Sequence, residues 1–178
     1  MLDQILIPLP NNGRRAGVED WLDRQSEFKK LPIRISEGDS HRAMIAADVG
    51  LIKSGTSTLE AALLKLPHVV TYDGHWLSKL VFKLVAKYTG AISLVNLVDQ
   101  LRGDKSEYIV PELIFEEFGP DSFVNHLRPL FKQESSERKG MMEGFVRIHG
   151  KLSAFGESPS QFAAEKFLKL MRERGVEA

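Results

Sequence analysis

The sequence predicts an α/β fold, in which a parallel β-sheet is flanked by helices and followed by a helical C-terminal segment. Short apolar runs alternate with longer amphipathic segments over residues 4–72, which is typical of consecutive β-α-β units. At 178 residues the chain can bury a substantial core. We therefore expect one domain over 1–178, of which 121–178 form a helical segment. Three segments after residue 120 have helical periodicity: 121–131, 134–152 and 159–174.

The first β-α-β unit is bounded by clear turn signals. The run Gln4–Leu9 is a short strand, followed by the turn Asn11-Asn12-Gly13. Glu19–Lys30 reads as a polar helix, and Pro32–Ser36 as the next strand.

The second unit carries the strongest periodicity. Gly38-Asp39-Ser40 forms a loop and a helix N-cap before a helix over 41–47, and the apolar run Val49–Ile52 is a buried strand. The next helix, 57–66, places Leu59, Ala62, Leu63 and Leu66 at i, i+3, i+4 and i+7, and leads to a strand over 68–72. Ligands of such sheets lie beyond the carboxyl ends of the strands, where we expect the loops 36–40, 53–57 and 72–75.

Residues 75–88 form an apolar stripe at helical spacing, with lysines repeating every four residues on another face. A basic amphipathic helix of this kind can lie on an anionic membrane surface. The alternative is a surface helix that packs on its own core and leaves its lysines in solvent. Beyond it we expect a strand over 91–97, a polar loop over 99–107 and a short helix over 111–118.

Composition restricts the class of protein. The 24 basic and 24 acidic residues balance, so no overall field favours nucleic acid, and the absence of cysteine excludes a disulfide scaffold or a thiolate metal site. The N-terminus has no basic region before a long apolar core, and no apolar run approaches the ~18 residues of a membrane span. The protein is therefore expected in the cytoplasm. The five histidines form no i, i+4 pair, so we expect no metal site.

The turn Ser54-Gly55-Thr56-Ser57-Thr58 joins a strand to a helix, and it is the candidate binding site. Small residues there allow the first free N–H groups of the helix to face a ligand, and the helix dipole favours an anion such as a diphosphate. The alternative is a capping box, in which Ser57 and Glu60 satisfy each other's backbone donors.

The order of several motifs resembles the C-terminal half of the lipid-A-disaccharide synthases. The motifs are Gly38-Asp39-Ser40, Ala46-Ala47-Asp48, Ser54-Gly55-Thr56-Ser57-Thr58-Leu59-Glu60, Pro67-His68-Val69-Val70-Thr71-Tyr72, Ser93-Leu94-Val95-Asn96-Leu97 and Val110-Pro111-Glu112-Leu113. The resemblance implies a Rossmann-like half of a GT-B glycosyltransferase, truncated relative to the family, which binds UDP-2,3-diacylglucosamine as donor without a metal or other cofactor. It also implies that the lipid acceptor binds an N-terminal half outside this chain, at the inner membrane, and that two copies can pair.

Site residues follow from the same resemblance. Glu60 would accept hydrogen bonds from the ribose hydroxyls of UDP, and residues 54–58 would hold the diphosphate. Asn96 would lie near the donor and His41 near the uracil, although a surface or capping role is open for His41. The general base would belong to the missing half, so no catalytic residue is assigned here.

Two departures from the family pattern leave other functions open. Val95 replaces a proline, and extra residues over 98–110 separate Asn96 from Val110. Glu112 is then a site residue or only a favourable charge at a helix N-terminus. The alternatives are a non-catalytic interaction module or remnant, or another UDP-sugar enzyme such as a UDP-GlcNAc 2-epimerase or the lipid-II glycosyltransferase.

Overall fold

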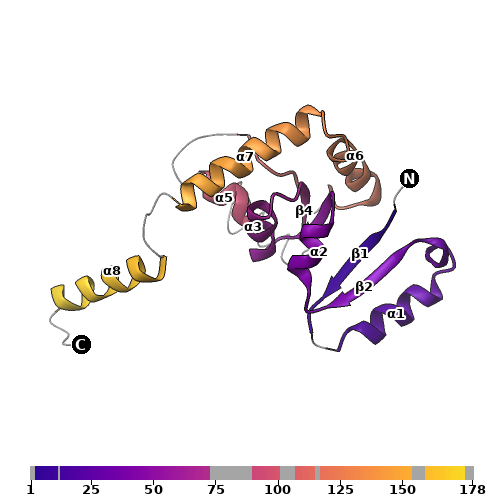
Figure 1. The fold of residues 1–178 in the computed structure, drawn as a ribbon, viewed down its shortest axis with the longest axis horizontal. Coiled ribbons are helices and arrows are strands. Elements are labelled where there is room, and N and C mark those ends of the chain that lie inside the picture. Colours follow the sequence, from indigo (N-terminus) through magenta and orange to yellow (C-terminus); the bar gives the residue numbers. More distant parts are fainter. Residues whose placement is uncertain are drawn as a thin grey trace, which may run out of the picture.

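The computed structural model describes residues 3–11, 13–72, 90–100, 107–114, 117–153 and 159–174, and it has the expected α/β architecture with parallel strands (Figure 1). The strands are β1 (Ile5–Leu9), β2 (Ile33–Glu37), β3 (Gly50–Lys53), β4 (His68–Tyr72) and β5 (Glu112–Ile114). The helices are α1 (Arg15–Arg24), the 3-10 turn η1 (Phe28–Lys30), α2 (Ser40–Ala46), α3 (Thr56–Leu63), α5 (Leu94–Gln100), α6 (Pro120–Leu130), α7 (Ser136–Ser153) and α8 (Pro159–Glu173).

The parallel strands form two separate sheets in the described part of the chain. One sheet has the order β1-β2 with Ile5 opposite Ile33, and the other has the order β3-β4-β5 with Gly50 opposite His68 and Val70 opposite Glu112. The connection through α2 carries the chain from the first sheet to the second. A parallel sheet was predicted correctly, whereas its division into two was not.

The core lies between the three-stranded sheet and helices α3, α5, α6 and α7. Its strand β4 is central, which explains the continuous burial of His68, Val69 and Val70. Phe145 and Ile148 of α7 pack into the same cluster, together with Val95 of α5. Figure 1 shows α8 standing apart from these elements, with an exposed Phe167.

The helix expected over 19–30 is instead α1 at Arg15–Arg24, followed by the 3-10 turn η1 at Phe28–Lys30. Two further elements differ in type from the sequence prediction. Residues 91–97 were expected as a strand, but α5 begins at Leu94, because Glu112 and Ser93 supply acceptors for backbone N–H groups at its start. Residues 111–118 were expected as a helix, but residues 112–114 pair with β4, and Leu113 is buried in the core. In both places tertiary contacts override the local pattern.

The capping box, which was the alternative to a binding role for this turn, does not form at the start of α3. The helix begins at Thr56, one residue earlier than expected, with Gly55 as its N-cap and no side-chain hydrogen bond at the cap. The Thr58 hydroxyl donates to the Gly55 carbonyl at 2.8 Å, and Glu60 turns towards another helix.

Gly144 provides a test of the packing between α7 and the segment before β5. A Cβ on Gly144 would lie 2.5 Å from Cγ2 of Ile109, whereas a Cβ on Gly140 of the same helix would meet nothing within 4 Å. We expect Gly144→Ala to lower the free energy of unfolding by roughly 1–3 kcal/mol through overpacking. Gly140→Ala should raise it by up to about 1 kcal/mol, because alanine favours helix. Equal effects of the two variants in urea denaturation would contradict this contact.

His68 provides a second test, through pH. Its Nδ1 donates to the Leu66 carbonyl at 2.8 Å, its ring stacks on Phe145, and burial lowers its pKa to about 4 from 6.5. The unfolded chain binds the proton on His68 more readily than the folded chain does. The contribution of neutral His68 to the free energy of unfolding should therefore be fully present above pH 6.5. It should be lost between pH 6.5 and 4, by up to about 3 kcal/mol.

The measurement is the free energy of unfolding at several pH values for the parent chain and for His68→Phe. The variant keeps an aromatic ring but cannot titrate, so its slope between pH 6.5 and 4 should be smaller. His126→Gln, at an exposed histidine, is the control and should keep the parent slope. An unchanged slope in His68→Phe would show that His68 does not carry the effect.

Candidate functional site

The candidate site is the N-terminus of α3 together with the loop that precedes it. Gly55 has φ +152°, a conformation that other residues rarely adopt, and no atom lies within 4 Å of a Cβ built on it. Thr56 is exposed, and no side chain caps the helix. The first N–H groups of α3 are therefore open to a ligand, at the end of the helix where the dipole favours negative charge.

Ser54 and Thr58 lie on either side of this opening and bond inwards. The Ser54 hydroxyl donates to the Ile92 carbonyl at 2.9 Å, and its N–H donates to the Thr71 carbonyl at 2.8 Å. The Thr58 side chain is fully buried, with its hydroxyl on Gly55. These two residues fix the shape of the loop, while Gly55, Thr56 and Ser57 present it.

Glu60 and His41 are brought together from different helices. Oε2 of Glu60, one turn into α3, lies 3.1 Å from Nε2 of His41 in α2. Their side chains remain 40% and 66% exposed, so the pair is accessible and contributes little to stability. A ligand hydroxyl can therefore reach the Glu60 carboxylate.

Asn96 lies inside the protein. It is 1% exposed, and its two amide hydrogens are used by the Val110 carbonyl at 2.9 Å and by Oε1 of Glu112 at 2.8 Å. Its Oδ1 accepts from the N–H of Val110 at 3.2 Å. In this conformation Asn96 has no amide hydrogen left for a donor molecule, and it joins α5 to the start of β5.

Glu112 connects β5 to the start of α5 through hydrogen bonds of its side chain. The sequence left open whether it is a site residue or only a favourable charge at a helix N-terminus. Its carboxylate accepts from the N–H groups of Ile92 and Ser93 at 2.8 and 2.9 Å, and from the Ser93 hydroxyl at 2.7 Å. Since Ile92 also accepts the Ser54 hydroxyl, a chain of hydrogen bonds links Glu112 to the candidate loop. Ser93 followed by a helix was the available signal, because serine is a preferred N-cap.

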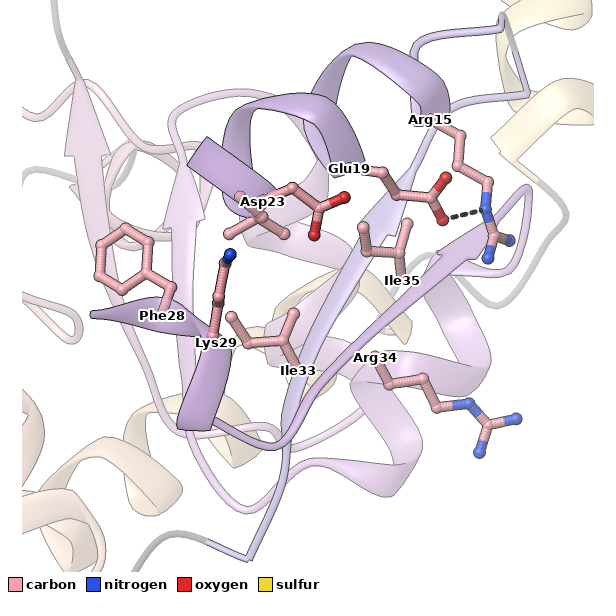
Figure 2. Close-up of a pocket in the computed structure, with 9 residues that line it drawn as sticks. Arg15, Glu19, Asp23, Phe28, Lys29, Ile33, Arg34 and Ile35 are labelled. Atoms are coloured by element: carbon pink, nitrogen blue, oxygen red, sulfur yellow. Dashed lines mark hydrogen bonds and ion pairs between the residues drawn. The ribbon is translucent and has the colours of Figure 1, made fainter. Parts of the chain in front are cut away.

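A pocket of about 750 Å³ lies elsewhere, between α1 and β2 (Figure 2). Its lining combines Phe28 and Ile33 with charged groups, among them Arg15, whose Nε is 2.7 Å from Oε1 of Glu19. None of the eight predicted donor residues lines this pocket. It is a surface hollow under a loosely packed helix, since α1 buries no residue.

The described ranges contain neither a metal-binding cluster nor a membrane-spanning helix. Within these ranges no group of three or more histidine or acidic residues could hold a metal ion. In the same part of the chain, no helix has the length and apolar character needed to cross a membrane. The basic helix predicted over 75–88 lies outside the described residues.

Most of the chain, including the candidate site, is similar to known proteins. A family model described as lipid-A-disaccharide synthetase matches residues 3–165. The lipid-A-disaccharide synthase of Cupriavidus pinatubonensis is 33% identical over 171 residues, which cover 96% of this chain and 39% of that relative. The corresponding enzyme of Pseudomonas putida (strain GB-1) is 36% identical over 96% of this chain and 41% of the relative.

A shorter match shows the same relationship. The lipid-A-disaccharide synthase of Saccharophagus degradans is 38% identical over 82% of this chain and 35% of the relative. The chain thus spans about two fifths of the length of the first two relatives. From residue 3 to residue 165, it belongs to the lipid-A-disaccharide synthase family.

Proposed function

We propose that this chain is the donor-binding half of a glycosyltransferase of lipid A biosynthesis, with UDP-2,3-diacylglucosamine as its donor. The observation that carries the proposal is the uncapped N-terminus of α3, with Glu60 and His41 beside it, within the region matched by the family. An open helix start suits a diphosphate, and a carboxylate one turn along suits two neighbouring hydroxyls of a ribose.

The residues divide into those that contact the donor and those that hold the loop. The backbone N–H groups of Gly55, Thr56 and Ser57 and the hydroxyls of the last two would bind the diphosphate. Glu60 would bind the ribose, and His41 would orient that carboxylate and lie near the uracil. Ser54 and Thr58 would maintain the loop from within. The direct donor contact predicted for Asn96 stays a prediction, and its hydrogen bonds favour an indirect role through Glu112.

The reaction is an inverting displacement at the anomeric carbon of the donor sugar. The 6-hydroxyl of the acceptor, 2,3-diacylglucosamine 1-phosphate, attacks that carbon, and the bond to the diphosphate breaks. UDP departs with the negative charge, which the N-terminus of α3 stabilises more as it develops. The acceptor and the general base would be supplied by the part of the relatives that this chain does not span, on the cytoplasmic side of the inner membrane. Membrane contact through 75–88 and pairing of two copies stay predictions.

A second candidate function is a non-catalytic interaction module. The amphipathic helix α8 favours it, because Phe167 and Leu170 are exposed. A folded chain that binds no UDP would support this alternative.

The test of the donor site is a titration of the chain with UDP, followed by calorimetry. We expect saturable binding that Glu60→Gln weakens by about 10-fold or more, because hydrogen bonds to a charged group contribute ~1.5–3 kcal/mol. Glu134→Gln is the matched control, since Glu134 is exposed and pairs with Lys139 on α7. Equal affinities of the parent chain and Glu60→Gln would contradict the ribose contact. Absence of UDP binding by the folded parent chain would overturn the donor-site proposal.

Glu112→Gln tests the support of the loop. A glutamine directs its amide hydrogens at the N–H group of either Ile92 or Ser93, which leaves that part-buried donor unsatisfied. We expect the free energy of unfolding to fall by about 1–3 kcal/mol and UDP to bind more weakly. Glu117→Gln, at an exposed position after β5, should change neither quantity. Parent-like stability and UDP affinity in Glu112→Gln would show that the carboxylate does not support the loop.

A further inference from the structure

The pair of His41 and Glu60 contains one residue of the type that titrates near neutral pH. Histidine is the side chain that ordinarily gains or loses its proton between about pH 5 and 8. Nε2 of His41 lies 3.1 Å from Oε2 of Glu60, and both side chains are open to solvent. The pair therefore carries one negative charge when His41 is neutral and no net charge when His41 is protonated.

Protonation changes the charge of this pair without changing its hydrogen bond. Both oxygens of a carboxylate are acceptors, so the contact with Glu60 requires a hydrogen on Nε2 of His41. The neutral ring meets this requirement as its Nε2–H tautomer, and the second proton is then added at Nδ1. No hydrogen bond among the described residues involves Nδ1 of His41, so this atom is available for the proton.

The charged residues on the elements around His41 are of types that do not ordinarily titrate between about pH 5 and 8. They are Asp39 and Arg42 beside it on α2, Glu60 on α3, Glu37 at the end of β2 and Lys53 at the end of β3. The strand β1 packs against α2 and contains no charged residue. In this part of the chain, His41 is therefore the group whose charge depends on pH, while His75 lies outside the described residues.

The charge of the pair matters because the proposed ligand is an anion. Glu60 lies one turn along α3 from Thr56, about 6 Å along the helix axis, and the diphosphate would bind at Thr56. A carboxylate at this separation repels the diphosphate. Hydrogen bonds to the ribose make Glu60 favourable on balance, but the repulsion reduces that gain. A proton on His41 compensates the charge of Glu60 and removes most of the repulsion.

We propose that protonated His41 is the cationic group of the donor site, so that a UDP-sugar binds more strongly as the pH falls. This inference rests on the proposed function, because it concerns the same site. His41 would compensate charge and position Glu60, and it would take no part in bond breaking. If the ribose shares the carboxylate with His41 or displaces it, the imidazolium of α2 still places one positive charge near the diphosphate.

The opposite effect of protonation is a tighter pair that withholds Glu60 from the ribose. The geometry argues against it, because a carboxylate has about four lone-pair sites and His41 uses one of them. The Glu60 side chain is 40% exposed, so the remaining sites are accessible to two hydroxyls. The sign of the pH dependence therefore distinguishes charge compensation from withdrawal of the carboxylate.

The test measures the affinity of the full 178-residue chain for UDP-glucose by calorimetry, between about pH 5.5 and 8. UDP-glucose replaces UDP because a terminal phosphate titrates at about pH 6, whereas a diphosphate esterified at both ends does not. We expect the dissociation constant to be roughly 3-fold or more lower at the acid end of this range. Circular dichroism at each pH checks that the chain stays folded, since His68 lowers stability in acid.

Three variants assign the pH dependence to one residue. His41→Gln can donate to Glu60 but never carries a charge, so its affinity should stay at the alkaline value of the parent. His41→Arg is always charged, so its affinity should stay at the acid value of the parent. His126→Gln, at an exposed histidine of α6, is the matched control and should keep the pH dependence of the parent.

Proton uptake separates this role of His41 from a purely structural one. A ligand that prefers the protonated site takes up protons when it binds. Calorimetry near neutral pH in two buffers of different ionisation enthalpy should therefore show uptake of a fraction of a proton by the parent, and none by His41→Gln. High salt should reduce the pH dependence, because the effect is electrostatic and the site is exposed.

The possible failures are distinguishable. An affinity of the parent that does not change with pH, or that falls in acid, would overturn this inference and leave the proposed function intact. The same holds if His41→Gln keeps the pH dependence of the parent. Absence of UDP-glucose binding by the folded parent at every pH would overturn the proposed function and this inference together.

Discussion

The conformation of the candidate site depends on the hydrogen bonds that the Glu112 carboxylate accepts. It accepts hydrogen bonds from two backbone N–H groups, one hydroxyl and one side-chain amide, which brings together the start of α5 and the edge strand β5. The peptide group between Ala91 and Ile92 donates to this carboxylate, and the next carbonyl, that of Ile92, receives the Ser54 hydroxyl. A charged acceptor makes these bonds stronger than neutral ones. The loop before α3, which contains Ser54, is thus held by Glu112, a residue 58 positions later in the sequence.

The binding loop combines a rigid frame with groups that stay free. Its rigidity comes from Ser54 and Thr58, whose hydroxyls bond to carbonyls of the protein. Its openness comes from Gly55, since a capping side chain at that position would use the N–H groups that a ligand needs. The pair between His41 and Glu60 is exposed and weak, so a ligand can replace it at little cost. The N-terminus of α3 thus lacks the stabilisation of a side-chain cap, and its N–H groups remain accessible to an anionic ligand.

Local patterns predicted the four strands up to residue 72 and the helices α2 and α3 between them, because each of these strands has its own apolar run. They failed at 91–97 and 111–118, where a helix cap from Glu112 and pairing with β4 decide the structure. The same distinction holds for the site. The proximity of His41 and Glu60 follows from consecutive β-α units, whereas the burial of Asn96 depends on a contact with β5 that no nearby residue announces. The separation into two sheets also lies beyond local pattern, since it concerns which edges meet.

The uneven burial along the chain has a consequence for cooperativity. All fully buried residues of the described part lie between Thr58 and Ile148, so residues 3–53 contribute little to the shared core. Segments with few buried contacts open at lower free energy than the rest of a protein, as separate cooperative units. The first β-α-β unit should therefore behave as a foldon of its own, unfolding before the remainder. A single melting temperature would then not describe this chain, and probes placed in α1 and in α7 would report two different transitions.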